Sequence, residues 1–289
     1  MCKASRVSVR LDELTTLAQG LDHPEGVTTD RDGVLYAGGE AGQVYRIDID
    51  TDTFEQVGDT GGFLLGLCAD SRGLLYCCDV GRKEVVLVDP RTGEVSTYSS
   101  GSAGRQMVNP NWPVFDDTGN LYVTDSGTWK GDDGCVFKIS PGGSTEVWSS
   151  EATNFPNGAC LSADGSALLV LESCSPALVE IPIESGTAGR PREIARLTGI
   201  PDGIALDIEG NAYVCYYRPD RIDRITPGGS VETLAEDPEG TVLSAPTNGV
   251  WVGEDLDEFI VGNLGRWHLT RCRWGVRGLP LRYPDLGAA

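Results

Sequence analysis

Short apolar runs alternate with turns rich in glycine, aspartate and asparagine along almost the whole chain. The segment 200–214, IPDGIALDIEGNAYV, is typical, because two strand-like runs at 204–206 and 212–215 flank a Glu-Gly-Asn turn. Glycine, aspartate and asparagine supply positive φ or cap the turn at such places, which is a hairpin signal. No stretch combines helical period with helical length. The pattern therefore predicts an all-β protein.

The same unit recurs six times at a nearly constant spacing. One turn position marks each copy: Gly33, Gly73, Gly119, Gly165, Gly210 and, in a weaker sixth copy, Leu256. Successive positions are 40, 46, 46, 45 and 46 residues apart. Four short strands per unit with a period in the forties indicate a propeller blade. We predict one domain, residues 1–289: a six-bladed β-propeller of four-stranded blades in residues 20–284. An N-terminal strand at about 8–19 is expected to close the last blade.

Composition restricts the setting and the partners. No apolar run approaches the 18 residues of a membrane span, and the start of the chain has no apolar signal-peptide core. The nine cysteines lack metal-type C-x-x-C spacing, so we expect free buried thiols in a cytoplasmic protein. A net charge of −20 disfavours nucleic acid and anionic membranes as partners. We expect a small-molecule substrate and a monomer or weak homo-oligomer.

The residue seven or eight positions before each turn marker should lie at one mouth of the central channel. These six residues are Glu25, Leu65, Asn111, Asn157, Asp202 and Asn248. Two carboxylates would repel there, and burying them unpaired costs several kcal/mol each. A cation between them removes that cost, and oxygen donors favour a hard divalent ion. We predict a central-channel metal site for Ca²⁺, with Mn²⁺, Mg²⁺ or Zn²⁺ as alternatives. A metal that only pins the blades together is the other interpretation.

The tripeptides around three of these residues carry a family resemblance. PEG at Glu25, NG at Asn157 and PDG at Asp202, in this order and on this period, resemble the senescence-marker-protein (regucalcin)/gluconolactonase/luciferin-regenerating-enzyme family. The resemblance implies a six-bladed propeller with one catalytic divalent ion that hydrolyses lactones. It implies Glu25, Asn157 and Asp202 as metal ligands. It also places Asn111 at the metal, its bound water and the substrate, so Asp202 and Asn111 are the candidate catalytic residues.

The third unit departs from the family pattern. Sugar-lactonase members have an Asn-Asp pair there, preceded by an Arg that holds the sugar, whereas this chain has Asn109 at the Arg position and Trp112 at the Asp position. We therefore predict that Trp112 faces the pocket beside the metal and that the substrate is less hydroxylated than gluconolactone. Related propellers include organophosphate hydrolases and metal-free strictosidine-synthase-like proteins, so a phosphotriesterase and a non-hydrolytic binding protein stay open.

Loops between the second and third strands of each unit should form the rim of the pocket. Their aromatic and basic residues complete the candidate substrate-binding set: Asn109, Trp112, Trp129, Lys130, Tyr216, Arg218, Asn248 and His268. His268 is either a general base or the donor of a hydrogen bond to a carbonyl, and His23 is expected beside the site rather than in it. The chain has no G-x-S-x-G elbow, so metal-assisted attack by water is favoured over a serine nucleophile.

Overall fold

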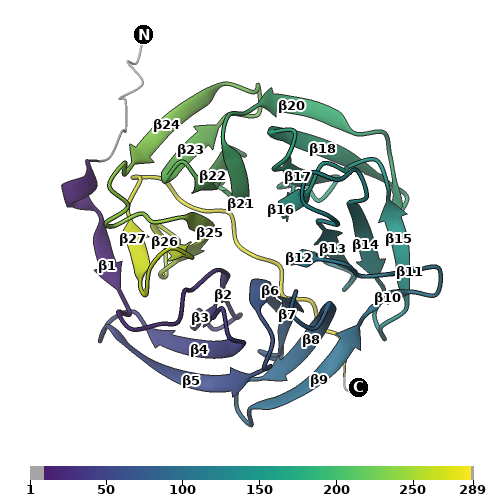
Figure 1. Ribbon diagram of the computed structural model, residues 1–289, viewed down its shortest axis with the longest axis horizontal. Helices are drawn as coiled ribbons and strands as arrows, with labels where there is room; N and C mark the ends of the chain where they lie inside the picture. Colours follow the sequence, from purple (N-terminus) through teal and green to yellow (C-terminus); the bar gives the residue numbers. More distant parts are fainter. Residues whose placement is uncertain (1–9, 288–289) are drawn as a thin grey trace.

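The computed structural model describes residues 10–287 as a ring of antiparallel sheets around a central channel (Figure 1). Within these residues, six four-stranded blades form the ring, which confirms the predicted all-β, six-bladed architecture. The first strand of each blade lines the channel, and the later strands lie progressively further out. Inner strands are buried along their whole length, as at Leu35–Gly38, Leu75–Asp79 and Ala167–Glu172, because both faces of a blade pack on its neighbours.

The blades follow the order of the chain. Blade 1 contains β2 (Val27–Thr29), β3 (Leu35–Gly38), β4 (Gln43–Asp48) and β5 (Thr53–Asp59). Blade 2 contains β6 (Leu64–Ala69), β7 (Leu75–Asp79), β8 (Glu84–Asp89) and β9 (Glu94–Ser99), and is followed by a small hairpin of β10 (Gly101–Ser102) and β11 (Arg105–Gln106). Blade 3 contains β12 (Pro110–Phe115), β13 (Leu121–Asp125), β14 (Cys135–Ile139) and β15 (Thr145–Ser149).

The second half of the ring repeats this plan. Blade 4 contains β16 (Pro156–Leu161), β17 (Ala167–Glu172), β18 (Ala177–Glu184) and β20 (Arg192–Arg196), with short β19 (Thr187–Ala188) also paired to β18. Blade 5 contains β21 (Ile200–Leu206), β22 (Ala212–Arg218), β23 (Arg221–Ile225) and β24 (Val231–Glu236). Blade 6 contains β25 (Pro246–Val252), β26 (Glu258–Asn263) and β27 (Leu269–Cys272), with β1 (Thr15–Leu17) outermost.

The two ends of the described chain close the ring. After the short 3₁₀ helix η1 (Leu11–Glu13), β1 pairs antiparallel with β27, so blade 6 combines strands from both ends. The sequence pattern extended the sixth blade to residue 284, but the last strand ends at Cys272. Residues 275–287 instead form a strap that crosses the turn-side end of the channel (Figure 1). The Leu279 N–H donates to the Leu206 carbonyl at 2.8 Å, and Tyr283 bonds Thr29 at the same distance.

Apolar packing occurs between blades rather than at the axis. Six buried clusters occur in the described chain, and each joins one neighbouring pair of blades around the ring. Between blades 5 and 6, for example, Tyr213 lies edge-on to Trp251 with ring centres 5.0 Å apart. Because burial is shared in this way, the axis is left free for polar groups. None of the described residues belongs to a helix long and apolar enough to cross a bilayer.

The turn joining the first two strands has one backbone shape in all six blades. All six marker residues adopt positive φ: Gly33 81°, Gly73 75°, Gly119 87°, Gly165 70°, Gly210 80° and Leu256 53°. Each donates its N–H to the carbonyl three residues earlier, and Leu256 does so at 3.1 Å. The sixth copy therefore keeps the turn without glycine, and the repeat assignment of blade 6 is confirmed.

Gly33→Ala tests the backbone requirement at this turn. A Cβ at Gly33 meets no atom within 4 Å, so the loss reflects only the positive φ. We expect the free energy of unfolding to fall by about 1–2 kcal/mol, measured by denaturant titration. Gly104→Ala is the matched control, because Gly104 also has open space but no positive φ. Equal losses in the two variants would contradict the assignment.

Candidate metal centre

The polar ring predicted from the repeat lies where the first strands begin, at the end of the channel opposite the turns. The exposed fractions are 4% for Glu25, 4% for Asn111, 4% for Asn157, 6% for Asp202 and 1% for Asn248. Leu65 occupies the sixth place at 9%. Irregular pairing at the start of β6, β12, β16, β21 and β25 accompanies these positions. Bulges of this kind redirect side chains, which here places the ring at the channel mouth.

The ring contains buried oxygen atoms that have no hydrogen-bond donor. These unpaired oxygens are Glu25 Oε2, Asn111 Oδ1, Asn157 Oδ1, Asp202 Oδ1 and Asn248 Oδ1, and the Asn248 Nδ2 also lacks a partner. One such atom costs about 1–3 kcal/mol and is rare in a folded protein. Five oxygens from five blades, all unpaired at the channel mouth, form a donor set that fits a bound cation.

Electrostatics at the two carboxyl groups lead to the same conclusion. Burial raises the pKa of Glu25 to about 7. The pKa of Asp202 is raised well above its ordinary value, first by burial and then by the nearby Glu25 carboxylate. Each carboxylate therefore disfavours the charge of the other. A divalent cation would favour the charged form of both.

The donor types indicate which ions the ring accepts. No three His, Cys, Asp or Glu side chains gather in residues 10–287 as a metal cluster. The ring offers two carboxylates, and its remaining donors are carboxamide oxygens. All-oxygen sets suit Ca²⁺, Mg²⁺ and Mn²⁺, whereas zinc selects nitrogen and sulfur.

Two serines that sequence analysis passed over orient the carboxamides. Asn111 Nδ2 donates to Ser126 Oγ at 3.0 Å, and Asn157 Nδ2 donates to Ser173 Oγ at 3.2 Å. Each serine hydroxyl in turn donates to a backbone carbonyl of the next blade, Ser126 to Pro156 at 2.7 Å and Ser173 to Pro201 at 2.6 Å. Since the amide nitrogens are taken, the oxygens are the atoms left for a ligand. The two serines directly follow Asp125 and Glu172. This acid–Ser pair occurs at the same place in blades 3 and 4, and it is the feature of the sequence that could have identified the serines.

The acids before these serines fix the entry to the first strand of their own blade. Asp125 accepts the N–H groups of Val108 at 2.7 Å and Asn109 at 3.0 Å. Glu172 similarly accepts the backbone N–H of Asn154 at 2.9 Å. A buried carboxylate that receives several backbone donors is well satisfied, so these acids are structural and not candidate ligands.

Trp112 lies elsewhere than expected. The prediction placed its indole in the pocket beside the metal, but the residue is only 8% exposed and lines the channel cavity on the inner side of the ring. The backbone N–H of Trp112 donates to Thr124 Oγ1 at 3.1 Å, and the Trp112 side chain belongs to the apolar cluster between blades 3 and 4. The indole therefore bounds the site from inside the channel.

Two predicted rim residues are buried away from the mouth. Tyr216 is fully buried because β22 extends to Arg218, and its ring packs under the Arg221 guanidinium at 4.3 Å. The rim assignment of Tyr216 is therefore wrong. His268 lies with Nε2 3.1 Å from the Val242 carbonyl, which matches the hydrogen-bonding alternative rather than the general base.

Other predicted residues do lie on the rim. Trp129 is 47% exposed and packs edge-on against Phe155, with Lys130 exposed beside it. Arg218 is exposed and pairs with Asp220.

Across the mouth, Trp267 is 53% exposed and packs against His23, whose Nδ1 lies 3.1 Å from Asp22. His23 is thus outside the ring, while half-buried Asn109 keeps an unpaired Oδ1.

Comparisons with known proteins agree with the fold. A family profile described as the SMP-30/Gluconolactonase/LRE-like region matches residues 23–263. The chain is 27% identical over 238 residues to a gluconolactonase from Zymomonas mobilis, an alignment covering 75% of this chain and 59% of that relative. The chain thus spans somewhat more than half the length of this curated relative.

Two solved structures resemble the whole propeller. A gluconolactonase from Xanthomonas campestris superposes with a TM-score of 0.80 at 18% identity, covering 94% of this chain and 93% of the other. A calcium-binding regucalcin from Agrobacterium tumefaciens gives 0.74 at 15% identity, covering 94% and 98%. These likenesses establish the six-bladed fold, and the profile match over residues 23–263 establishes the lineage. The chain belongs to the SMP-30/gluconolactonase/LRE-like family.

Proposed function

We propose that this protein is a metal-dependent hydrolase of lactones or related small cyclic esters. The observation that carries the proposal is the ring of unpaired buried oxygens, which includes two carboxylates with raised pKa. Family membership and the likeness to a gluconolactonase support the lactonase class. Family membership alone leaves the reaction open, because one fold hosts many reactions, so the ring is the decisive feature.

The residues that would hold the ion are Glu25, Asn157 and Asp202, with Ca²⁺ as the first candidate. Ca²⁺ accepts carboxylate and carboxamide oxygens from flexible sets of six to eight donors, and the remaining places would fall to Asn111, water and substrate. When bound, a divalent ion supplies Lewis-acid polarisation of an ester carbonyl and lowers the pKa of bound water.

Within this proposal, the protein's own groups position water and move a proton. Asp202 Oδ1 has no partner in the protein and would face the ion, so the second oxygen of this carboxylate is the one that can accept a proton from an attacking water. Asn111 Oδ1 is likewise free and is oriented by Ser126, so it can hold that water in place. Leu65 and Trp112 exclude bulk solvent from the inner side of the ring, which strengthens each polar interaction there.

The rim suits a substrate with apolar surface. Trp129, Tyr217 and Trp267 are all more than one-third exposed, and they rise from blades 3, 5 and 6 around the mouth. Exposed aromatic side chains at a concave mouth favour flat or apolar ligands. Asn109, at the position where related sugar lactonases carry Arg, offers only a neutral amide. We therefore propose a less hydroxylated substrate than gluconolactone.

Thiol chemistry supports a reducing compartment. Eight cysteines lie within the described residues and all are free, including Cys77 and Cys78, which are adjacent and buried. Burial raises the pKa of the Cys77 thiol, which keeps it protonated and unreactive. We propose a cytoplasmic location for the protein on this basis.

Asp202→Asn tests the metal centre. The substitution removes one buried charge and keeps the shape, so we expect metal-dependent turnover to fall at least 100-fold while the propeller still folds. In metal-free protein at neutral pH, the free energy of unfolding should rise by about 1 kcal/mol or more, because the substitution removes an uncompensated buried charge. Calorimetric metal titration, activity and thermal melts provide the three measurements.

The control for this variant is Asp132→Asn, which changes an exposed carboxylate on a rim loop. It should leave all three measurements unchanged. Loss of folded Asp202→Asn protein even with excess metal would instead favour a metal that only holds the blades together. Wild type that binds no divalent ion at millimolar concentration would overturn the proposal.

Ser173→Ala tests the orientation of the ligand carboxamide. Without the hydroxyl, the Asn157 amide loses its fixed partner, so we expect metal affinity to drop about 10- to 100-fold by calorimetry. Exposed Ser150 provides the control, and Ser150→Ala should bind metal like wild type. An unchanged affinity in Ser173→Ala would show that the serine has no role in orienting the site.

A lactone panel tests the substrate class. We expect kcat/KM for alkyl-substituted γ-lactones to exceed that for gluconolactone by about tenfold or more, because the aromatic rim desolvates apolar surface. Trp129→Ala should narrow this difference, since it removes one exposed ring. A wild type that prefers gluconolactone would contradict the assignment of a less hydroxylated substrate.

A further inference from the structure

The position after the ring residue breaks the sixfold pattern in one blade only. Five blades carry glycine there, namely Gly26, Gly66, Gly158, Gly203 and Gly249. Blade 3 carries Trp112, the largest residue type in place of the smallest. The substitution does not follow from the repeat, so it calls for a reason specific to this chain.

Glycine is required at the five other positions by close contact with a neighbouring strand. A Cβ would stand 2.0 Å from the Leu65 carbonyl oxygen at Gly26, 2.8 Å from that of Asn111 at Gly66 and 2.3 Å from that of Asp202 at Gly158. At Gly203 it would lie 2.4 Å from the Thr247 oxygen, and at Gly249 2.2 Å from the Phe259 ring. Real Cβ contacts are longer than these, so at the first four positions the inner strands of neighbouring blades approach each other backbone to backbone.

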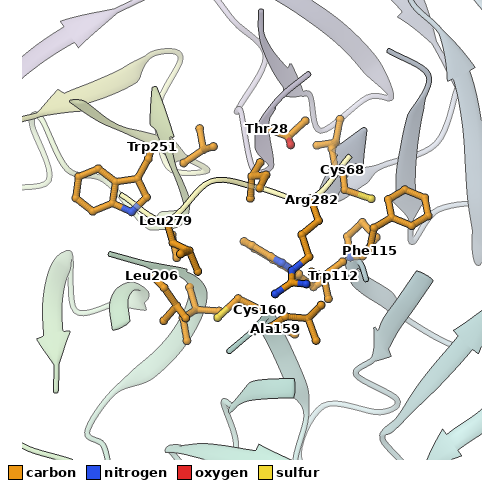
Figure 2. A pocket seen from close by; sticks show the side chains of 18 of the residues that line it. Thr28, Cys68, Trp112, Phe115, Ala159, Cys160, Leu206, Trp251, Leu279 and Arg282 are labelled. Atoms are coloured by element: carbon orange, nitrogen blue, oxygen red, sulfur yellow. The ribbon is translucent and has the colours of Figure 1, made fainter. Parts of the chain in front are cut away.

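The indole of Trp112 uses the space that these glycines leave. A Cβ on Gly203 would come within 2.9 Å of indole Cη2, so the side chain extends from blade 3 as far as blade 5. Figure 2 shows the Trp112 side chain extending inward from β12 toward the middle of the pocket. Gly203 follows Asp202 directly. The indole therefore lies next to the ring, on its inner side.

Beyond the indole, the channel holds an apolar cavity of about 90 Å³. Residues three positions after the ring line its wall, among them Cys68, Cys160 and Ala205. Leu279 and Arg282 of the strap line the cavity at the turn-side end, and Arg282 is held by Asp117 and by the Ser162 carbonyl at 3.3 Å. The channel thus contains a polar mouth and an apolar chamber.

We propose that Trp112 is a specificity-determining residue that closes the floor of the metal site and separates it from this chamber. The inference rests on the proposed hydrolase function. With the floor in place, the substituent of a lactone has to lie on the rim side. Without it, the chamber becomes the inner extension of the site and takes an alkyl chain. In that case an alkyl chain would pass from the metal site into the chamber beside Leu65, where the ring offers no metal donor.

Trp112→Gly gives blade 3 the glycine that the other five blades carry and tests this directly. Wild type and variant are compared on γ-lactones with unbranched alkyl chains of one to seven carbons. We expect the kcat/KM ratio of the longest to the shortest to rise about tenfold or more in Trp112→Gly, because added methylenes become buried. Free indole should fill the vacated space and reverse the gain, with no effect on wild type.

Two further variants separate a specific effect from general damage. Ala205→Leu narrows the chamber beyond the floor, so it should leave wild-type specificity unchanged and cancel the gain in Trp112→Gly. Trp112→Phe keeps an aromatic floor and should retain the wild-type chain-length profile. An unchanged ratio in folded Trp112→Gly would overturn the proposal, as would a gain that survives Ala205→Leu.

A binding measurement keeps this inference separate from the proposed activity. Indole should raise the melting temperature of Trp112→Gly by several degrees, but not that of wild type or of Ala205→Leu, because both of these keep the Trp112 ring in place. If no variant hydrolyses any lactone while indole binds only Trp112→Gly, the hydrolase proposal fails and the floor stands. If lactones are hydrolysed but indole stabilises all three proteins equally, the floor is contradicted and the hydrolase proposal stands.

Discussion

Two buried carboxylates at the channel mouth, Glu25 and Asp202, are the constraint around which this propeller is organised. They come from blades 1 and 5, and burial raises both of their pKa values, while the Glu25 carboxylate raises that of Asp202 further. Nothing else in the described ring supplies a positive charge, since its other members are three asparagines and a leucine. A fold that gathers these groups without a cation is strained by several kcal/mol. The blades supply that free energy through apolar packing between neighbours, which leaves the axis available for chemistry.

The repeat made much of this visible in the sequence. The spacing of Gly33 and its equivalents reports a turn that needs positive φ, and Leu256 at 53° shows that the spacing carries the information even where the residue type changes. Counting back from the turn reaches the ring because each ring residue stands eight residues before its marker, at or near the start of the first strand. This constant spacing links local sequence to ring geometry, so the fold class and the ring membership could be predicted.

The residues that were misplaced depend on contacts between blades. Tyr216 was placed on a rim loop, but β22 continues two residues beyond it, to Arg218. The Tyr216 ring is covered by Arg221. The strap of residues 275–287 has no period, so nothing local distinguishes it from a blade strand. Ser126 and Ser173 bond to carbonyls of the following blade, and no pattern within one repeat reports such partners. Sequence periodicity predicts the strands and turns within a blade, but it does not predict the contacts between neighbouring blades.

The same contacts between blades explain why one departure from the repeat can change a site without changing the fold. At the position after the ring, only glycine fits in five blades, because a Cβ would meet the backbone of the neighbouring inner strand in four of them and the Phe259 ring in blade 6. The small residues that permit this approach also leave a shallow space along blades 4 and 5, and the Trp112 indole occupies it. A bulky side chain in any of the five glycine positions would instead collide with backbone or with the Phe259 ring. Blade 3 is therefore the place where the inner boundary of the metal site can vary while the ring of donors stays fixed.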